Sequence, residues 1–137
     1  MLNKILSVII GCIKGNDINY VFSTYDGKNV EKKPNDIVIT VGIGEFNMKK
    51  PVYSDEYCSY PYKITAEISI TAPYWCSADR LYEILCNVVI ERLTASDMNF
   101  DSIKSVSVKN DSKLKRIVYN SEIMLSGIYS IRRGESV

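Results

Sequence analysis

The chain has 137 residues, of which 46% are hydrophobic and 24% charged, so it can form a globular domain with a core of its own. The 17 basic and 16 acidic residues leave a net charge of +1, which gives no overall field to attract nucleic acid or an anionic membrane. The sequence contains no histidine, and this removes the usual general base of serine and cysteine hydrolases.

The first predicted element is an amphipathic helix from Leu2 to Lys14, ended by Gly15. Its apolar residues recur at helical spacing: Leu2, Ile5, Leu6, Ile9 and Ile13. The same segment holds Ile9-Ile10-Gly11-Cys12, which is similar to the lipoprotein cleavage site of bacteria. Its apolar run is shorter than the roughly 7–15 residues of a secretion signal, so we favour a core or interface helix. No stretch is long enough to cross a bilayer, and we expect no membrane partner.

Strand patterns follow this helix. A short strand from Tyr20 to Tyr25 ends at the turn sequence Asp26-Gly27, and a polar loop runs from there to Asp36. Two long strands are predicted next, from Asp36 to Met48 and from Tyr62 to Ala72. Residues 49–61 join them, so we expect a long hairpin with an extended tip. The second strand has one apolar face, formed by Ile64, Ala66, Ile68 and Ile70.

The second half of the chain predicts a helix and two more strands. The helix runs from Ala78 to Thr94 behind the capping residue Ser77, with a buried stripe of Leu81, Leu85, Val88 and Val89. The strands run from Phe100 to Lys109 and from Lys115 to Ile131. The last strand is apolar on both faces, which indicates a central strand or one covered by a neighbouring subunit. The sequence therefore predicts one α+β domain over residues 1–137, a mostly antiparallel sheet with a long hairpin, packed by two helices.

Aromatic residues are dense between the two long strands and after them. Tyr and Trp provide large contact area at low entropic cost, so we predict that four tyrosines form a protein interface: Tyr53, Tyr57, Tyr60 and Tyr62. The alternative is that these rings pack on the domain's own sheet edge. Tyr74 and Trp75 lie beside a helix start, and we expect them in the core.

Little in the sequence indicates catalysis. Glu45, Glu67 and Glu122 lie on predicted strands and are candidates for acid–base work, but a solvated or interface position explains them more simply. The four cysteines match no zinc-binding spacing, and Val41-Gly42-Ile43-Gly44-Glu45 is not a dinucleotide-binding motif. We therefore predict no catalytic residue, no cofactor and no metal.

Two basic clusters are the remaining candidates for a partner-facing surface. One consists of Lys113, Lys115 and Arg116, and the other of Arg132 and Arg133. Such clusters are most often solvated turns and tails, but in a ring they would line a channel through which DNA passes without sequence-specific binding.

The order of helix, β-hairpin, helix and two strands resembles the tail terminator family of bacteriophages and phage-tail-like bacteriocins. Four segments carry the resemblance: Ile37–Glu45, Lys63–Ile70, Ala78–Leu85 and Glu122–Tyr129. The resemblance spans most of the chain.

The resemblance implies a structural protein of a virion or phage-tail-like particle that is assembled in the bacterial cytoplasm. Members of the family form hexameric rings that cap the tail tube, stop its polymerisation and join it to the neck, collar or sheath. The implied partners are further copies of the chain, the tube protein, and a sheath or neck protein. Two alternatives stay open: another neck or tail-completion protein, and a monomeric protein-binding module with an aromatic loop.

Overall fold

The computed structural model describes residues 2–15, 18, 20–23, 36–113 and 115–134. Its helices, in chain order, are α1 (Leu2–Ile13), α3 (Ala78–Glu83), the π-helical segment η2 (Ile84–Ile90) and α4 (Glu91–Thr94). Its strands are β1 (Val21–Ser23), β2 (Val38–Met48), β3 (Val52–Tyr53), β4 (Tyr57–Pro73), β5 (Asn99–Asp111) and β6 (Arg116–Arg132). The predicted α+β class is confirmed.

Within the described residues, the strands form one six-stranded sheet in the order β1-β2-β4-β6-β5, with β3 paired to β4. In this sheet β1 and β2 are parallel, and the other neighbours are antiparallel. The prediction that the last strand is central is confirmed, because β6 lies between β4 and β5. The β4–β6 ladder runs without a register shift from the pair Tyr57 and Arg132 to the pair Pro73 and Arg116.

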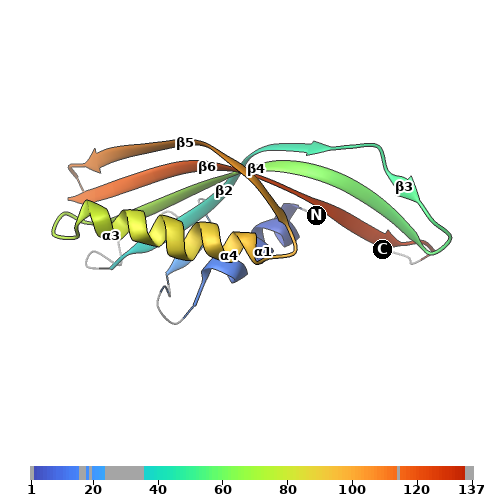
Figure 1. The fold of residues 1–137 in the computed structure, drawn as a ribbon, viewed down its shortest axis with the longest axis horizontal. Helices are drawn as coiled ribbons and strands as arrows, with labels where there is room; N and C mark the ends of the chain where they lie inside the picture. The colour runs from blue at the N-terminus through green and yellow to red at the C-terminus, as the bar shows by residue number, and fades with distance from the viewer. Residues whose placement is uncertain (1, 16–17, 19, 24–35, 114, 135–137) are drawn as a thin grey trace.

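The helices cover one face of the sheet, and the core lies between the helices and that face (Figure 1). The predicted alternation in β4 is confirmed, because Ile64, Ala66, Ile68 and Ile70 are all at most 1% exposed. The first helix buries three residues of its apolar stripe, Ile5, Ile9 and Ile13. Arg92 of α4 donates a hydrogen bond of 2.5 Å to the carbonyl of Ile13 at the end of α1, and this joins the two helices.

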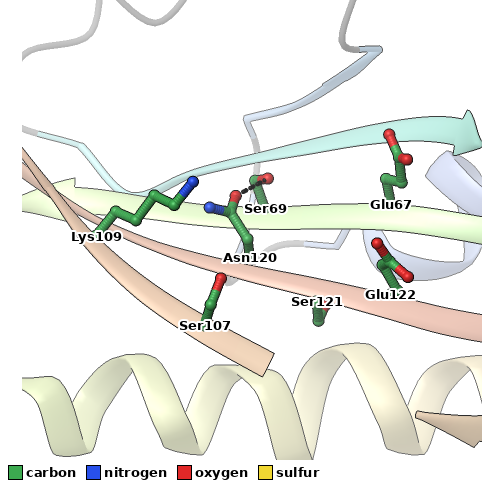
Figure 2. A pocket seen from close by; sticks show the side chains of 7 residues that line it. All are labelled: Glu67, Ser69, Ser107, Lys109, Asn120, Ser121 and Glu122. Carbon is green, nitrogen blue, oxygen red and sulfur yellow. Dashed lines mark hydrogen bonds between the residues drawn. The ribbon is translucent and has the colours of Figure 1, made fainter. Parts of the chain in front are cut away.

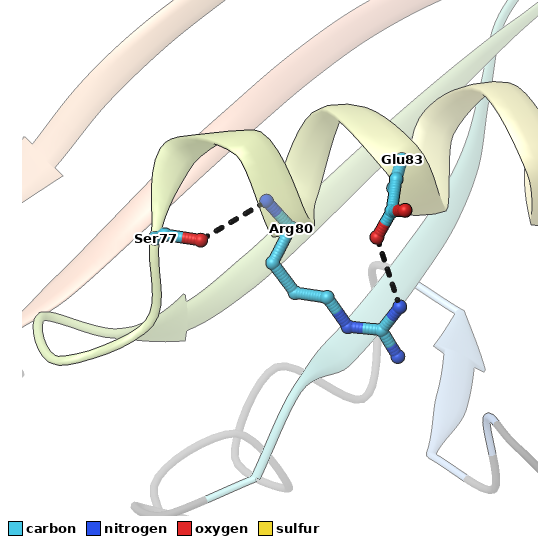
Figure 3. A network of polar contacts seen from close by, with 3 residues as sticks. All are labelled: Ser77, Arg80 and Glu83. Carbon is cyan, nitrogen blue, oxygen red and sulfur yellow. Dashed lines mark hydrogen bonds and ion pairs between the residues drawn. The ribbon is translucent and has the colours of Figure 1, made fainter.

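The predicted second helix consists of α3, η2 and α4, which follow one another without a gap, and it begins where the sequence predicts. The Oγ of Ser77 accepts a hydrogen bond of 3.2 Å from the backbone N–H of Arg80, which satisfies one free donor of the first turn (Figure 3). Arg80 also lies 3.4 Å from Glu83, an exposed ion pair of small energetic value. The buried stripe contains all four predicted residues and two more, Ile84 and Leu93.

The structure changes the predicted hairpin in one respect. Residues 57–61, predicted as part of the tip, belong to β4, which is 17 residues long. β6 has the same length, so the two strands continue together beyond the helices. They project as an extension that β3 flanks; α1 lies at its base, where Lys4 contacts Tyr129, and no helix lies beneath its outer part (Figure 1). We call residues 48–62 and 127–133 the β-arm.

Two other expectations have different outcomes. The predicted turn at Asp26-Gly27 and the loop after it lie outside the described residues, apart from Asp36. The prediction that Tyr74 and Trp75 are core residues is wrong, because they are 46% and 73% exposed. Both follow Pro73, the last residue of β4, so they lie past the end of the sheet and not over its core face.

Leu85→Asp tests the position of the second helix. Leu85 is 3% exposed, so an aspartate there would place a charge in the core, and we expect a loss of more than about 4 kcal/mol of stability. Tyr82→Asp on the same helix is the control, because Tyr82 is 60% exposed and the expected change is within about 0.5 kcal/mol. Urea unfolding followed by circular dichroism measures both. Equal unfolding midpoints for the two variants would contradict this helix placement.

Candidate functional site

The end of the β-arm is a well-defined turn. Ser54 accepts a hydrogen bond of 3.0 Å from the backbone N–H of Tyr57 through its Oγ, and its own N–H donates a bond of 2.8 Å to the carbonyl of Tyr57. Arg133 holds the same turn from the end of β6. Its guanidinium donates to the carbonyl of Ser54 at 2.9 Å and lies 5.5 Å from the ring centre of Tyr53. The arm end is therefore ordered before any partner binds, which lowers the entropic cost of binding.

Large apolar and aromatic side chains are exposed along this β-arm. Tyr53 is 64% exposed and Tyr57 44%, and both lie beside the terminal turn. The others are Met48, Val52, Ile128 and Ile131, which are 37–68% exposed. The strand register puts Tyr53 and Ile131 on one face of the arm and Val52, Tyr57 and Ile128 on the other. Large apolar side chains exposed on both faces of an uncovered strand pair make the arm a candidate interaction site. We call residues 52–57 and 131–133 the arm tip.

Of the four predicted interface tyrosines, two are exposed, one is half-buried and one is buried. Tyr53 and Tyr57 are exposed at the arm tip and Tyr60 is half-buried beside Cys58, whose hydrogen bond raises the pKa of the Tyr60 hydroxyl. Tyr62 is 6% exposed, so the prediction that its ring is presented with the other tyrosines is wrong: it is buried at the base of the arm. It stacks on Phe46 with ring centres 6.0 Å apart, and burial raises the pKa of its hydroxyl.

The burial of Tyr62 depends on the residue opposite it. Tyr62 pairs with Gly127 on β6, and its hydroxyl would lie 2.6 Å from a Cβ at that position. Glycine there leaves room for the ring to lie across the neighbouring strand. The packing therefore needs a pairing between two segments far apart in the sequence.

An apolar groove opens where α1 meets the base of the β-arm. Its volume is about 310 Å³, and its apolar lining is formed by Ile5, Val8, Tyr62, Met98, Ile128 and Tyr129. Lys4 lies at this groove with its Nζ 3.4 Å from the hydroxyl of Tyr129, and Asp97 also lines it. The sequence patterns missed the groove, although the apolar character of both faces of the last strand was a signal for Ile128.

The sheet face opposite the helices is polar. A hollow of about 280 Å³ lies over β4, β6 and β5, and its side chains point away from the helix layer, with the exception of Ser121 (Figure 2). Ser69 donates a hydrogen bond of 2.6 Å to the Oδ1 of Asn120 within this hollow. The face carries groups of both signs, as expected for a surface that meets water or a polar partner.

Two of the three candidate glutamates are neighbours on this polar face. Glu67 and Glu122 stand directly opposite each other in the β4–β6 ladder (Figure 2). Lys104 of β5 lies 3.6 Å from Glu122 and reduces the repulsion between the two carboxylates. Glu45 lines an adjacent hollow that also contains Glu67. Among the described residues no group of three or more metal-ligating side chains is placed to hold an ion.

The two predicted basic clusters lie far apart in the structure. Lys113 and Lys115 are exposed in the turn between β5 and β6, whereas Arg132 and Arg133 are exposed at the arm tip. The two ends of β6 are 16 residue steps apart, or roughly 50 Å along an extended strand. The two clusters therefore face different parts of any assembly.

Arg116 is not partner-facing, and that prediction is wrong. The side chain is 1% exposed, and its Nε donates to the Oγ1 of Thr71 at 2.9 Å. One terminal nitrogen donates to the carbonyl of Thr71 at 3.0 Å and to the carbonyl of Asp36. Burial lowers the pKa of the guanidinium, and the nearby carboxylates of Asp36 and Asp111 act in the opposite direction. Arg116 is thus a structural residue that joins the end of β4 to the segment before β2.

No protein-family model and no curated protein matches this chain. Two solved structures of one pilus protein are similar to it. The crystal structure of the type 4 fimbrial biogenesis protein PilO from Pseudomonas aeruginosa has 11% identity and a TM-score of 0.26, covering 66% of this chain and 58% of that one. The core region of PilO from the type IV pilus system of the same organism has 10% identity and a TM-score of 0.27, covering 71% and 83%. Such low TM-scores carry no argument about function.

No helix among the described residues combines the length and the apolar character needed to cross a membrane.

Arg116→Ala tests the structural role of the buried guanidinium. The substitution leaves the carbonyls of Thr71 and Asp36 without this donor, and we expect a loss of about 2–4 kcal/mol in the free energy of unfolding. Lys113→Ala, at an exposed position in the adjacent turn, is the control with an expected change within about 0.5 kcal/mol. Urea titration measures both, and an Arg116→Ala midpoint at the wild-type value would contradict the assignment.

Proposed function

We propose that this protein is a structural assembly protein whose copies form a ring that caps the end of a phage or phage-tail-like tube. The ring stops tube polymerisation and joins the tube to the neck, collar or sheath. The observation that carries the assembly role is the β-arm, an ordered extension beyond the helices with exposed apolar and aromatic residues. The tail terminator resemblance of the sequence supplies the identity of the assembly.

The charge balance and the sheet also support association. A net charge of +1 gives little repulsion between copies. In the part of the chain that the structure describes, β1 and β5 are the outermost strands of the sheet, and outer strands offer backbone groups for lateral contacts. Lateral contacts between unlike surfaces close into a ring when the rotation between copies allows it.

The polar sheet face suits a surface turned toward a lumen or a polar partner, because it carries charges of both signs around Glu67, Lys104 and Lys109. The basic clusters would contribute to DNA passage only at the places where an assembly brings them together. Neither role requires a catalytic group.

The mass of the purified chain tests the ring. We expect about six copies by light scattering, either alone or after addition of the tube protein, with annular particles in negative stain. A strict monomer under both conditions would contradict the proposal and favour the monomeric binding module.

Tyr53→Ala/Tyr57→Ala tests whether the β-arm mediates assembly. Both side chains are exposed, so we expect a native unfolding midpoint but association weaker by about 2 kcal/mol or more, which is roughly 30-fold. Trp75→Ala/Tyr82→Ala is the matched control. These rings are 73% and 60% exposed, but they lie away from the arm, one just after the end of β4 and the other on α3. Sedimentation velocity measures both, and equal association of the two double variants would exclude the arm tip as the interface.

A further inference from the structure

The chain presents two separate apolar surfaces near one another, the arm tip and the groove. The tip is a projection that bears Tyr53 and Tyr57, and the groove is a concave site at the base of the same arm. Tyr57 and Tyr62 are five residues apart on one continuous strand, or about 17 Å. The β4–β6 ladder has no register shift, so the arm is a continuous extended ribbon that carries the tip away from the groove. A tip of this kind does not fold back into the groove of its own chain.

The groove matches the tip in size and character. Its volume of about 310 Å³ receives a large aromatic side chain with part of its neighbours, and its lining is mostly apolar. Val8 at the groove is 49% exposed, so an occupant would remove apolar surface from water on both partners.

The charges around the two surfaces are complementary. The turn at the tip carries the exposed carboxylates of Asp55 and Glu56, and the groove has the ammonium group of Lys4 beside Tyr129. In the other direction, the tip has the exposed Arg132 and the groove has Asp97. Opposite charges at the rim of an apolar contact set its orientation and reject misaligned partners.

We propose that the arm tip of one copy docks in the groove of a second copy, with the acidic turn facing Lys4. This inference rests on the proposed function and names the contact between ring subunits. Each copy then offers one tip and one groove, so the contact is between unlike surfaces and propagates from copy to copy until it closes. The same contact covers the exposed rings of the tip and the exposed apolar residues of the groove.

Mixing two variants tests the unlike-surface contact. The tip variant is Tyr53→Ala/Tyr57→Ala, the groove variant is Val8→Asp, and Val108→Asp on β5 is a control that is 57% exposed and outside both surfaces. We expect the tip variant to weaken self-association roughly 30-fold, the groove variant to weaken it about tenfold or more, and the control to behave as wild type. Native mass spectrometry of an equimolar mixture of tip and groove variants, one isotope-labelled, should show one-to-one heterodimers and nothing larger. If both variants still form the same rings as the wild-type chain, the proposed contact is wrong, whereas the ring proposal is unaffected.

Photo-crosslinking gives a readout that does not need a stable ring. Benzoylphenylalanine in place of Tyr57, in a mixture of light and heavy chains, should form adducts between chains to residues 4–8 or 127–129. Adducts confined to other surfaces would overturn the contact. Adducts at the groove from a protein that stops at dimers would support the contact and contradict the ring.

A charge exchange tests the orientation. Lys4→Glu should weaken association, and Asp55→Lys/Glu56→Lys in the same chain should restore it, because every contact then again pairs opposite charges. Association that falls further in the combined variant would overturn the docking orientation.

Discussion

The ladder between β4 and β6 is the interaction on which the rest of the structure depends. Each strand has 17 residues, and the register is continuous from one end to the other. Over the larger part of its length, the ladder carries the core face that the helices cover. At its other end, residues 57–62 of β4 and 127–132 of β6 continue as the β-arm, with α1 only at the base (Figure 1). A single pairing therefore fixes the core, extends into the arm and sets which residues meet across it.

The exposed β-arm has a cost for an isolated chain. A strand pair without a covering layer leaves apolar side chains in water on both of its faces, as Tyr53, Tyr57 and Ile128 are here. The hydrogen bonds of Ser54 and Arg133 nevertheless keep the end of the arm ordered. An ordered apolar projection is suited to a partner surface of fixed shape, which is the physical basis of the assembly role.

The same ladder shapes the polar face. Its register places Glu67 opposite Glu122, a pairing of like charges that Lys104 of the adjacent strand moderates. The two faces of the sheet thus differ in kind. One face is buried beneath the helices and carries the core, whereas the other presents charges of both signs.

Local chemistry made much of the fold predictable from the sequence. The period-two pattern from Ile64 to Ile70, the helical spacing in α1 and the cap at Ser77 each depend on residues close together in the chain, and the structure confirms them. Exposure at Tyr53 and Tyr57 also followed from the density of aromatic residues between two strands.

Only the tertiary structure decided which residues of a pattern are buried and which are presented. Tyr62 is buried because Gly127 lies opposite it, and Arg116 is buried because it reaches the carbonyls of Thr71 and Asp36. The groove combines α1 with the far end of β6. These features depend on strand register and helix placement between segments up to 125 residues apart. A local pattern carries the chemistry of each side chain but not the identity of its neighbour in space.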